Sequence, residues 1–210
     1  NGGEVIDDEG KVRVGEPESV EAGGFLSSLY TEHKAMPDSV LTANSWDEVN
    51  APFIQERAGM LVSGDWAIAA LKNGNPNLDW SVHPLPVGKQ AATVIGGYNL
   101  AVNANTSVGD ASWQLVEWLT GPRSVELMGK YNRLSAAAGA AAPEAIAALP
   151  EEIKPFMEQA DAGRARPVVA EWSQIHSEVF GTVWDSVLRG QPVADVMSKA
   201  DAQTKSIMGQ

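Results

Sequence analysis

The chain has 210 residues, 44% of them hydrophobic, which is enough for one large domain or two small ones. Its 27 acidic and 15 basic residues leave a net charge of −12, which argues against binding to the phosphate backbone of a nucleic acid. The absence of cysteine excludes a disulfide scaffold and the common structural zinc sites and suits an extracytoplasmic protein, and no apolar run reaches the ~20 residues of a membrane span.

The first half of the sequence predicts strands that alternate with helices, and so an α/β architecture. Residues 1–15 predict a short hairpin, and Pro17 suits the first turn of a helix. Ser45 is the predicted N-cap of a second helix, which Pro52 would bend or split, and Gly74 closes a third helix that starts at Trp66. The apolar stripe of the first helix is Ala22, Phe25, Leu26, Leu29 and Tyr30, and the predicted strands are 60–62, 80–85 and 93–102.

From Asp110 onward the sequence predicts mainly helices. Gly121-Pro122 separates two of them, and the alanine-rich run 135–142 favours helix over disorder. The first of these helices carries the stripe Ala111, Leu115, Trp118 and Leu119. A helix over 172–188 carries two apolar columns, one of Trp172, His176, Phe180, Trp184 and Leu188 and one of Ile175, Val179, Val183 and Val187; a last helix covers 193–207.

No catalytic, metal-binding or cofactor-binding motif is recognisable. No serine lies in a G-x-S-x-G elbow, and the three histidines lack the spacing of a metal-binding pair. Gly96-Gly97 lacks the third glycine and the helix start of a phosphate loop. The sequence therefore favours a binding protein without catalysis, metal or cofactor.

The segment 60–71, MLVSGDWAIAAL, places Trp66 at the start of a predicted helix. Its flat apolar ring, the side chains of Ser63 and Asp65, and the unpaired N–H groups of a first turn form a mixture that suits a sugar. The segment Gly96-Gly97-Tyr98 would bring backbone and another aromatic ring close to such a ligand. From composition and spacing alone, a core or capping role for Trp66 is the more common one.

The order of these motifs resembles the extracellular solute-binding proteins (family 1) of bacterial ABC importers, which include the maltose-, trehalose- and glycerol-3-phosphate-binding proteins. The resemblance covers essentially the whole chain and lies in order and spacing rather than in one motif. Leu134-Ser135 departs from the Leu-Pro that is usual in the family. The similar segments are Asn1-Gly2-Gly3, Asp8 to Lys11, Pro17 to Val20, Phe53 to Met60, Gly64-Asp65-Trp66, Leu85-Pro86, Gly96-Gly97, Leu100 to Val102, Ala111 to Leu119 and Arg166 to Trp172.

The resemblance implies an α/β, periplasmic-binding-protein-like fold of type II, of which the chain resembles only the second half. By analogy, residues 1–95 and 136–210 belong to the C-terminal lobe, and residues 96–135 form a hinge crossover and a segment of the N-terminal lobe. The rest of that lobe is absent from the sequence. We therefore expect a fragment, or a chain that a preceding segment completes, and the stripe that begins at Ala111 would then lack its partner.

The resemblance also implies the function of a substrate-binding component. Such a protein captures a carbohydrate, here a di- or oligosaccharide, between two hinged lobes and delivers it to the permease subunits. It is a monomer in the periplasm, or a lipoprotein on the outer face of the membrane. The residues that the resemblance assigns to ligand binding are Trp66 as a stacking platform, Ser63, Asp65, Gly96, Gly97, Tyr98, Trp172, Arg133 and Arg166.

Several alternatives stay open. Trp172 is either a second aromatic wall or a core residue, and Arg133 and Arg166 are either ligands for a phosphate-bearing solute or solvated surface residues. Within the family, a receptor for glycerol-3-phosphate or a glycerophosphodiester is the nearest alternative. A glycoside hydrolase would need two facing carboxylates, and a surface interaction module would have no small ligand.

Overall fold

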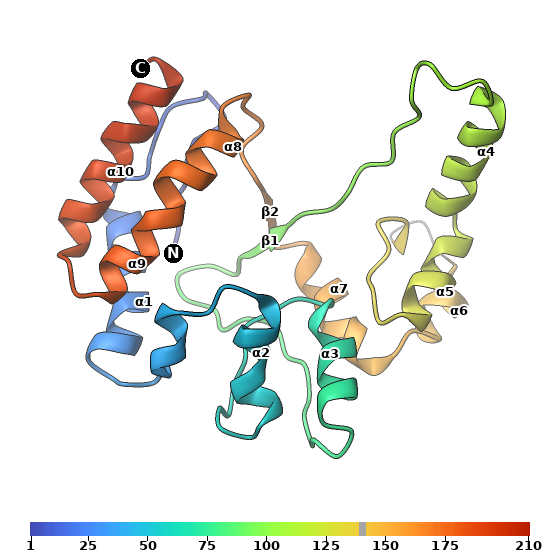
Figure 1. The fold of residues 1–210 in the computed structure, drawn as a ribbon, viewed down its shortest axis with the longest axis horizontal. Coiled ribbons are helices and arrows are strands. Elements are labelled where there is room, and N and C mark those ends of the chain that lie inside the picture. Colours follow the sequence, from blue (N-terminus) through green and yellow to red (C-terminus); the bar gives the residue numbers. More distant parts are fainter. Residues whose placement is uncertain (139–141) are drawn as a thin grey trace. The chain divides into compact units, whose positions relative to one another are not determined.

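The computed structural model describes residues 1–138 and 142–210 (Figure 1). The chain divides into two compact units, which we describe separately. Unit 1 comprises Asn1–Asn44, Val87–Ala91 and Arg166–Gln210, and unit 2 comprises Ser45–Pro86 and Ala92–Ala165. The lobe boundaries inferred by analogy, 1–95 with 136–210 and 96–135 between them, stay a prediction.

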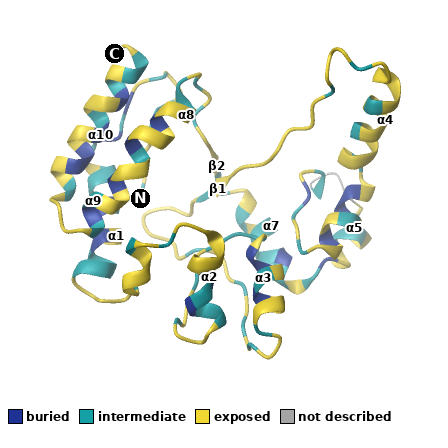
Figure 2. Cartoon of the chain, in the orientation of Figure 1, coloured by how far each residue is buried: buried dark blue, intermediate teal, exposed yellow. Residues whose placement is uncertain are grey.

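Unit 1 is a helical assembly with its core between α1 (Pro17–Thr31), α10 (Val193–Met208) and a continuous helix over 172–188. Only one of the two predicted columns of that helix is buried, since Ile175, Val179, Val183 and Val187 are at most 3% exposed whereas His176 is exposed (Figure 2). The predicted helices are confirmed. The elements are α1 (Pro17–Thr31), η1 (Asp38–Leu41), α8 (Trp172–Gln174), the π-helical segment η4 (Ile175–Phe180), α9 (Gly181–Leu188) and α10 (Val193–Met208).

The prediction that the apolar stripe of α1 forms its buried face is wrong. Phe25 is 64% exposed, and the buried residues of the helix are Gly23 and Ser27. A Cβ added to Gly23 would lie 2.7 Å from Cε of Met197, and the Ser27 hydroxyl donates a hydrogen bond to the Val187 carbonyl (3.0 Å). Small residues let α9 and α10 approach α1 closely, a cause of burial that hydrophobic periodicity does not report.

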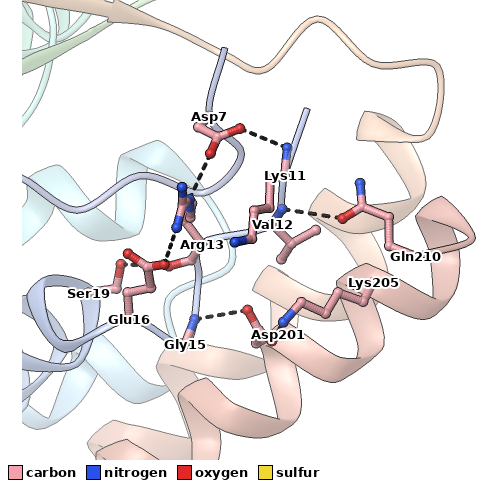
Figure 3. Close-up of polar contacts among 10 residues, drawn as sticks. All are labelled: Asp7, Lys11, Val12, Arg13, Gly15, Glu16, Ser19, Asp201, Lys205 and Gln210. Atoms are coloured by element: carbon pink, nitrogen blue, oxygen red, sulfur yellow. Dashed lines mark hydrogen bonds and ion pairs between the residues drawn. The ribbon is translucent and has the colours of Figure 1, made fainter. Parts of the chain in front are cut away.

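The predicted hairpin of residues 1–15 is confirmed as one antiparallel bridge between Ile6 and Val12. Within it, the Asp7 carboxylate accepts hydrogen bonds from the Lys11 backbone N–H (2.8 Å) and from Nε of Arg13 (2.7 Å) (Figure 3). Nη1 of Arg13 also donates to Glu16 (2.5 Å), directly before α1. This arginine therefore joins the hairpin to the start of α1.

The hairpin is also attached to α10 and to Gln210, which follows that helix. The Gln210 side chain donates to the Gly10 carbonyl (2.6 Å). It also accepts from the Val12 N–H (3.5 Å), and Asp201 accepts from the Gly15 N–H (3.2 Å) (Figure 3). These contacts join residues 186 to 200 positions apart in the sequence.

Asp7→Asn is expected to reduce the dependence of stability on acid pH. Hydrogen bonds from Lys11 and Arg13 lower the pKa of Asp7 in the folded state. The stabilisation is therefore complete above the unfolded pKa of about 3.9 and is lost as pH falls through the lower folded pKa. Urea unfolding between pH 7 and pH 3 should show a wild-type advantage over Asp7→Asn that shrinks in acid. Asp8→Asn, in the same turn, is the matched control, and an advantage that stays constant down to pH 3 would contradict the assignment.

Unit 2 contains short helices around a small core and one pair of strands. Its core consists of Ile68, Val125, Leu149 and Ile153, with Trp80, Leu134 and Phe156 among the partly buried residues against it. The elements are α2 (Trp46–Ile54), α3 (Ala67–Gly74), β1 (Thr93–Ile95), α4 (Gly109–Thr120), α5 (Arg123–Lys130), α6 (Pro143–Ala147), η3 (Glu151–Ile153), α7 (Lys154–Ala160) and β2 (Gly163–Ala165).

The strand predictions are largely wrong. Residues 60–62 and 80–85 form no strand, Met60 is 88% exposed, and the predicted strand 93–102 exists only as β1. β1 pairs in parallel with β2, which the sequence analysis missed. A strand forms only where a neighbour satisfies its backbone groups, and within the described residues β1 and β2 are the only paired strands.

The helix boundaries in unit 2 are mostly confirmed. Ser45 caps α2 by accepting from the Glu48 N–H (3.3 Å), and α3 ends at Gly74. Of the two expected effects of Pro52, a bend or a split, the split does not occur, because α2 continues through Pro52 to Ile54. The bend stays a prediction. Pro52 lies near the end of the helix, where the loss of one N–H donor interrupts little.

Helix α4 has no buried residue, and its predicted stripe is exposed: Leu115 by 56%, Trp118 by 51% and Leu119 by 38%. This is the result expected for a stripe without a partner. In the alanine-rich run, residues 136–137 form a turn where helix is predicted, and residues 139–141 lie outside the described residues. Of the helices described, none has both the length and the apolar content required to cross a membrane.

Candidate functional site

Trp66 occupies the N-cap position of α3 with a helical backbone (φ −62°, ψ −23°). The Ala67 N–H donates to the Gly64 carbonyl (3.0 Å) and the Ile68 N–H to the Asp65 carbonyl (3.2 Å). These two N–H groups, which the sequence analysis expected to be free, are therefore used within the turn. The side chain of Trp66 is 41% exposed, which excludes a fully buried core role.

Gly64 provides the space in which the Trp66 ring lies. A Cβ added at Gly64 would overlap three carbons of the six-membered ring, Cζ3, Cη2 and Cε3. The ring therefore folds back over its own turn and rests against the Gly64 backbone. Any side chain at this position would move the ring.

A second tryptophan lies against the first. The ring centroids of Trp46 and Trp66 are 5.3 Å apart, and their planes are inclined by 61° in an edge-to-face arrangement. Trp46 is the first residue of α2 and is 57% exposed. We call this pair the aromatic corner. The sequence analysis assigned no role to Trp46.

Asp65 connects the start of α3 to the segment after α5. Its carboxylate accepts from the Leu134 N–H (2.6 Å) and lies 3.6 Å from Nη1 of Arg133. Asp65 is not the N-cap residue of α3, and its carboxylate bonds the backbone N–H of Leu134, outside the helix. Arg133 remains 45% exposed at its side chain.

Ser63 is a predicted ligand contact, but its hydroxyl is not exposed to solvent. Its hydroxyl oxygen is buried and has no hydrogen-bond partner among the described residues. The side-chain amide oxygen of Asn50, in α2, is also buried and has no hydrogen-bond partner among the described residues. Buried polar atoms without a hydrogen-bond partner are uncommon in folded proteins. The role of Ser63 as a ligand contact stays a prediction.

Lys72 stabilises α3 at its other end. Its ammonium lies 2.8 Å from Glu152 and 3.2 Å from the side-chain oxygen of Asn132. The hydrogen bond from Lys72 lowers the pKa of Glu152. Together with the bond from Leu134 to Asp65, these contacts fix both ends of α3 to the chain that follows α5.

The other predicted binding residues are divided between the two units. Gly96 and Gly97 are exposed, and Tyr98 is fully exposed. Trp172 and Arg166 belong to unit 1. The Trp172 ring is half-buried, 6.2 Å from the His176 ring and 6.3 Å from the Phe180 ring, and Arg166 is exposed. Their roles in binding stay predictions.

Two surface hollows contain none of the predicted site residues. One, of about 460 Å³, lies at the acidic hairpin of unit 1, and the other, of about 300 Å³, lies between residues 100–106 and α4 of unit 2. Among the described residues, no group of three or more His, Asp or Glu side chains could hold a metal ion.

The sequence of the chain is similar to known solute-binding proteins. Residues 1–155 match the family described as bacterial extracellular solute-binding protein. A "probable ABC transporter-binding protein" of Deinococcus radiodurans is 31% identical over an alignment of 149 residues that covers 62% of this chain and 32% of that protein. The chain therefore spans about one third of the length of this relative.

The fold is similar to solved structures over nearly the whole chain. The GacH receptor of Streptomyces glaucescens, solved unliganded and with acarbose, has a TM-score of 0.85 at 23% identity, over 100% of this chain and 54% of that one. Lmo0181 of Listeria monocytogenes, in complex with cycloalternan, has a TM-score of 0.81 at 20% identity, with 100% and 54% covered. Maltose-bound MalE3 of T. maritima has a TM-score of 0.80 at 23% identity, with 98% and 54% covered. The chain thus has about half of a periplasmic-binding-protein-like fold, in a mixed α/β and mostly helical form.

Proposed function

Because the chain belongs to the bacterial extracellular solute-binding protein family, we propose that it is part of the carbohydrate-binding component of an ABC importer. Its ligand is a di- or oligosaccharide captured between two hinged lobes, and its partners are the permease subunits. The protein acts as a monomer in the periplasm, or as a lipoprotein on the outer face of the membrane. The family consists of solute-binding proteins rather than enzymes, so the glycoside hydrolase alternative is rejected.

The observation that carries the proposal is the partly exposed Trp66 ring, held on Gly64 at the start of α3. A pyranose presents C–H groups on its faces, which pack on an indole, while its hydroxyls need polar partners nearby. The relatives solved with acarbose, cycloalternan and maltose support a saccharide as the ligand class.

The arrangement at Asp65 favours a neutral sugar over glycerol-3-phosphate or a glycerophosphodiester. The Asp65 carboxylate lies 3.6 Å from Arg133 and offsets its positive charge. A phosphate-binding site would instead leave such an arginine free to pair with the ligand. Arg133 and Arg166 become the residues to test only if a phosphodiester is the ligand.

The proposal is tested by titrating the full-length protein with trehalose, maltose, cellobiose and glycerophosphocholine. Calorimetry should accompany tryptophan fluorescence, because Trp66→Ala removes a reporter as well as a contact. One sugar should bind saturably, and Trp66→Ala should weaken it about tenfold or more. Trp184→Ala is the matched control, since Trp184 in α9 is 40% exposed. Binding of glycerophosphocholine alone, or of none of the four, would contradict the proposal.

A further inference from the structure

We propose that Trp46 is a second stacking residue for the saccharide, so that the aromatic corner contacts two successive sugar rings. The inference rests on the proposed function and names a residue to which neither the sequence motifs nor the family resemblance gave a role. It starts from the edge-to-face contact between Trp46 and Trp66.

The two tryptophans are held by packed helices. α2 and α3 contact each other, and an added Cβ on Gly74 would lie 3.0 Å from the Ile54 side chain. The Asn75 side chain, directly after α3, donates to the Ile54 carbonyl at the end of α2 (3.1 Å). These contacts join the two helices at their C-terminal ends, and at their N-terminal ends the two tryptophan rings contact each other.

The exposure of the rings distinguishes them from core aromatics. Trp46 is 57% exposed and Trp66 41% exposed although they contact each other. A contact between two indoles could bury both, whereas here it leaves apolar surface of both available. Scattered exposed apolar residues are ordinary, but two exposed tryptophans in contact form a larger apolar surface of the kind found at binding sites.

The angle between the rings indicates the size of the ligand. Because the planes are inclined by 61°, a single flat pyranose cannot stack on both rings. Two pyranoses joined by a glycosidic bond can adopt different inclinations and can each cover one ring. The corner therefore fits a disaccharide or a longer chain, with Trp46 adding affinity through the second unit.

The test uses the full-length protein and the sugar that binds it among trehalose, maltose and cellobiose. We expect Trp46→Ala to weaken binding about tenfold and Trp46→Phe to recover most of the loss, because phenylalanine retains an aromatic face. Trp184→Ala should leave the affinity unchanged. Equal affinities for wild type, Trp46→Ala and Trp46→Phe would overturn the inference.

A second measurement separates contact with the sugar from support of the Trp66 ring. With 5-fluorotryptophan incorporated, the difference between fluorine shifts in H₂O and D₂O reports the solvent exposure of each indole. Saturating sugar should reduce this difference at Trp46 and Trp66 but not at Trp184. A reduction at Trp66 alone would reject the role of Trp46 and leave the proposed function intact, even if Trp46→Ala failed to fold. Absence of binding to any sugar would reject the proposed function itself.

Discussion

Gly64→Ala is expected to lower the sugar affinity of the protein by about tenfold or more while leaving its fold intact. The backbone at Gly64 has no left-handed φ, so alanine is tolerated by the main chain. The added methyl group would, however, occupy the space of the Trp66 six-membered ring, and the ring must rotate away. The stacking surface would then be displaced although every residue of the site other than Gly64 is still present.

The control for this prediction is Gly59→Ala, because Gly59 lies in the same unit and a Cβ there meets nothing within 4 Å. Calorimetric titration should find Gly59→Ala equal to wild type. In a Trp66→Ala background, Gly64→Ala should have no further effect, since the ring with which it collides is gone. Normal affinity of the Gly64→Ala protein would show that the Trp66 ring is not the platform.

Val187→Ala is expected to lower the free energy of unfolding by about 2 kcal/mol, the value for two buried methyl groups with the cavity they leave. Val187 lies in α9 and is 0% exposed in the core of unit 1, which this helix forms with α1 and α10. Its carbonyl also accepts the Ser27 hydrogen bond, so a shift of this turn would disturb α1.

Val168→Ala is the matched control for Val187, because the same substitution is made in the same unit at a residue that is 98% exposed. Urea unfolding followed by circular dichroism should place the Val168→Ala midpoint at that of wild type. A loss of similar size in both variants would mean that burial does not determine the cost.

The helices could be predicted from local signals, and the strands could not. Pro17, the Ser45 N-cap, Gly74 and the Gly121-Pro122 break mark boundaries that the structure confirms, because capping and backbone restriction act within a few residues. The strand predictions failed because a strand needs a pairing partner elsewhere in the chain. β1 pairs over only three residues, and its partner β2 lies about 70 residues later.

The site could be predicted only in part, for a related reason. The small polar turn before α3 indicates that Trp66 is unusual, and the structure places it partly exposed. The hydrogen bond from the Leu134 N–H to the Asp65 carboxylate joins residues 69 positions apart, so no local pattern shows it. Trp46 has the spacing of an ordinary helix residue, and its exposure and its contact with Trp66 emerge only from the packing of α2 against α3.

The contacts between the hairpin and α10 have a consequence for synthesis on the ribosome. Unit 1 joins residues 1–44 to residues 166–210, and its core needs Val12 and Val14 together with Val196, Met197 and Ala200. During translation, more than a hundred further residues must therefore be synthesised before the partners of residues 1–44, in residues 166–210, leave the exit tunnel. Unit 1 must fold late and through contacts of high sequence separation, which favours slow folding and prolonged exposure to chaperones.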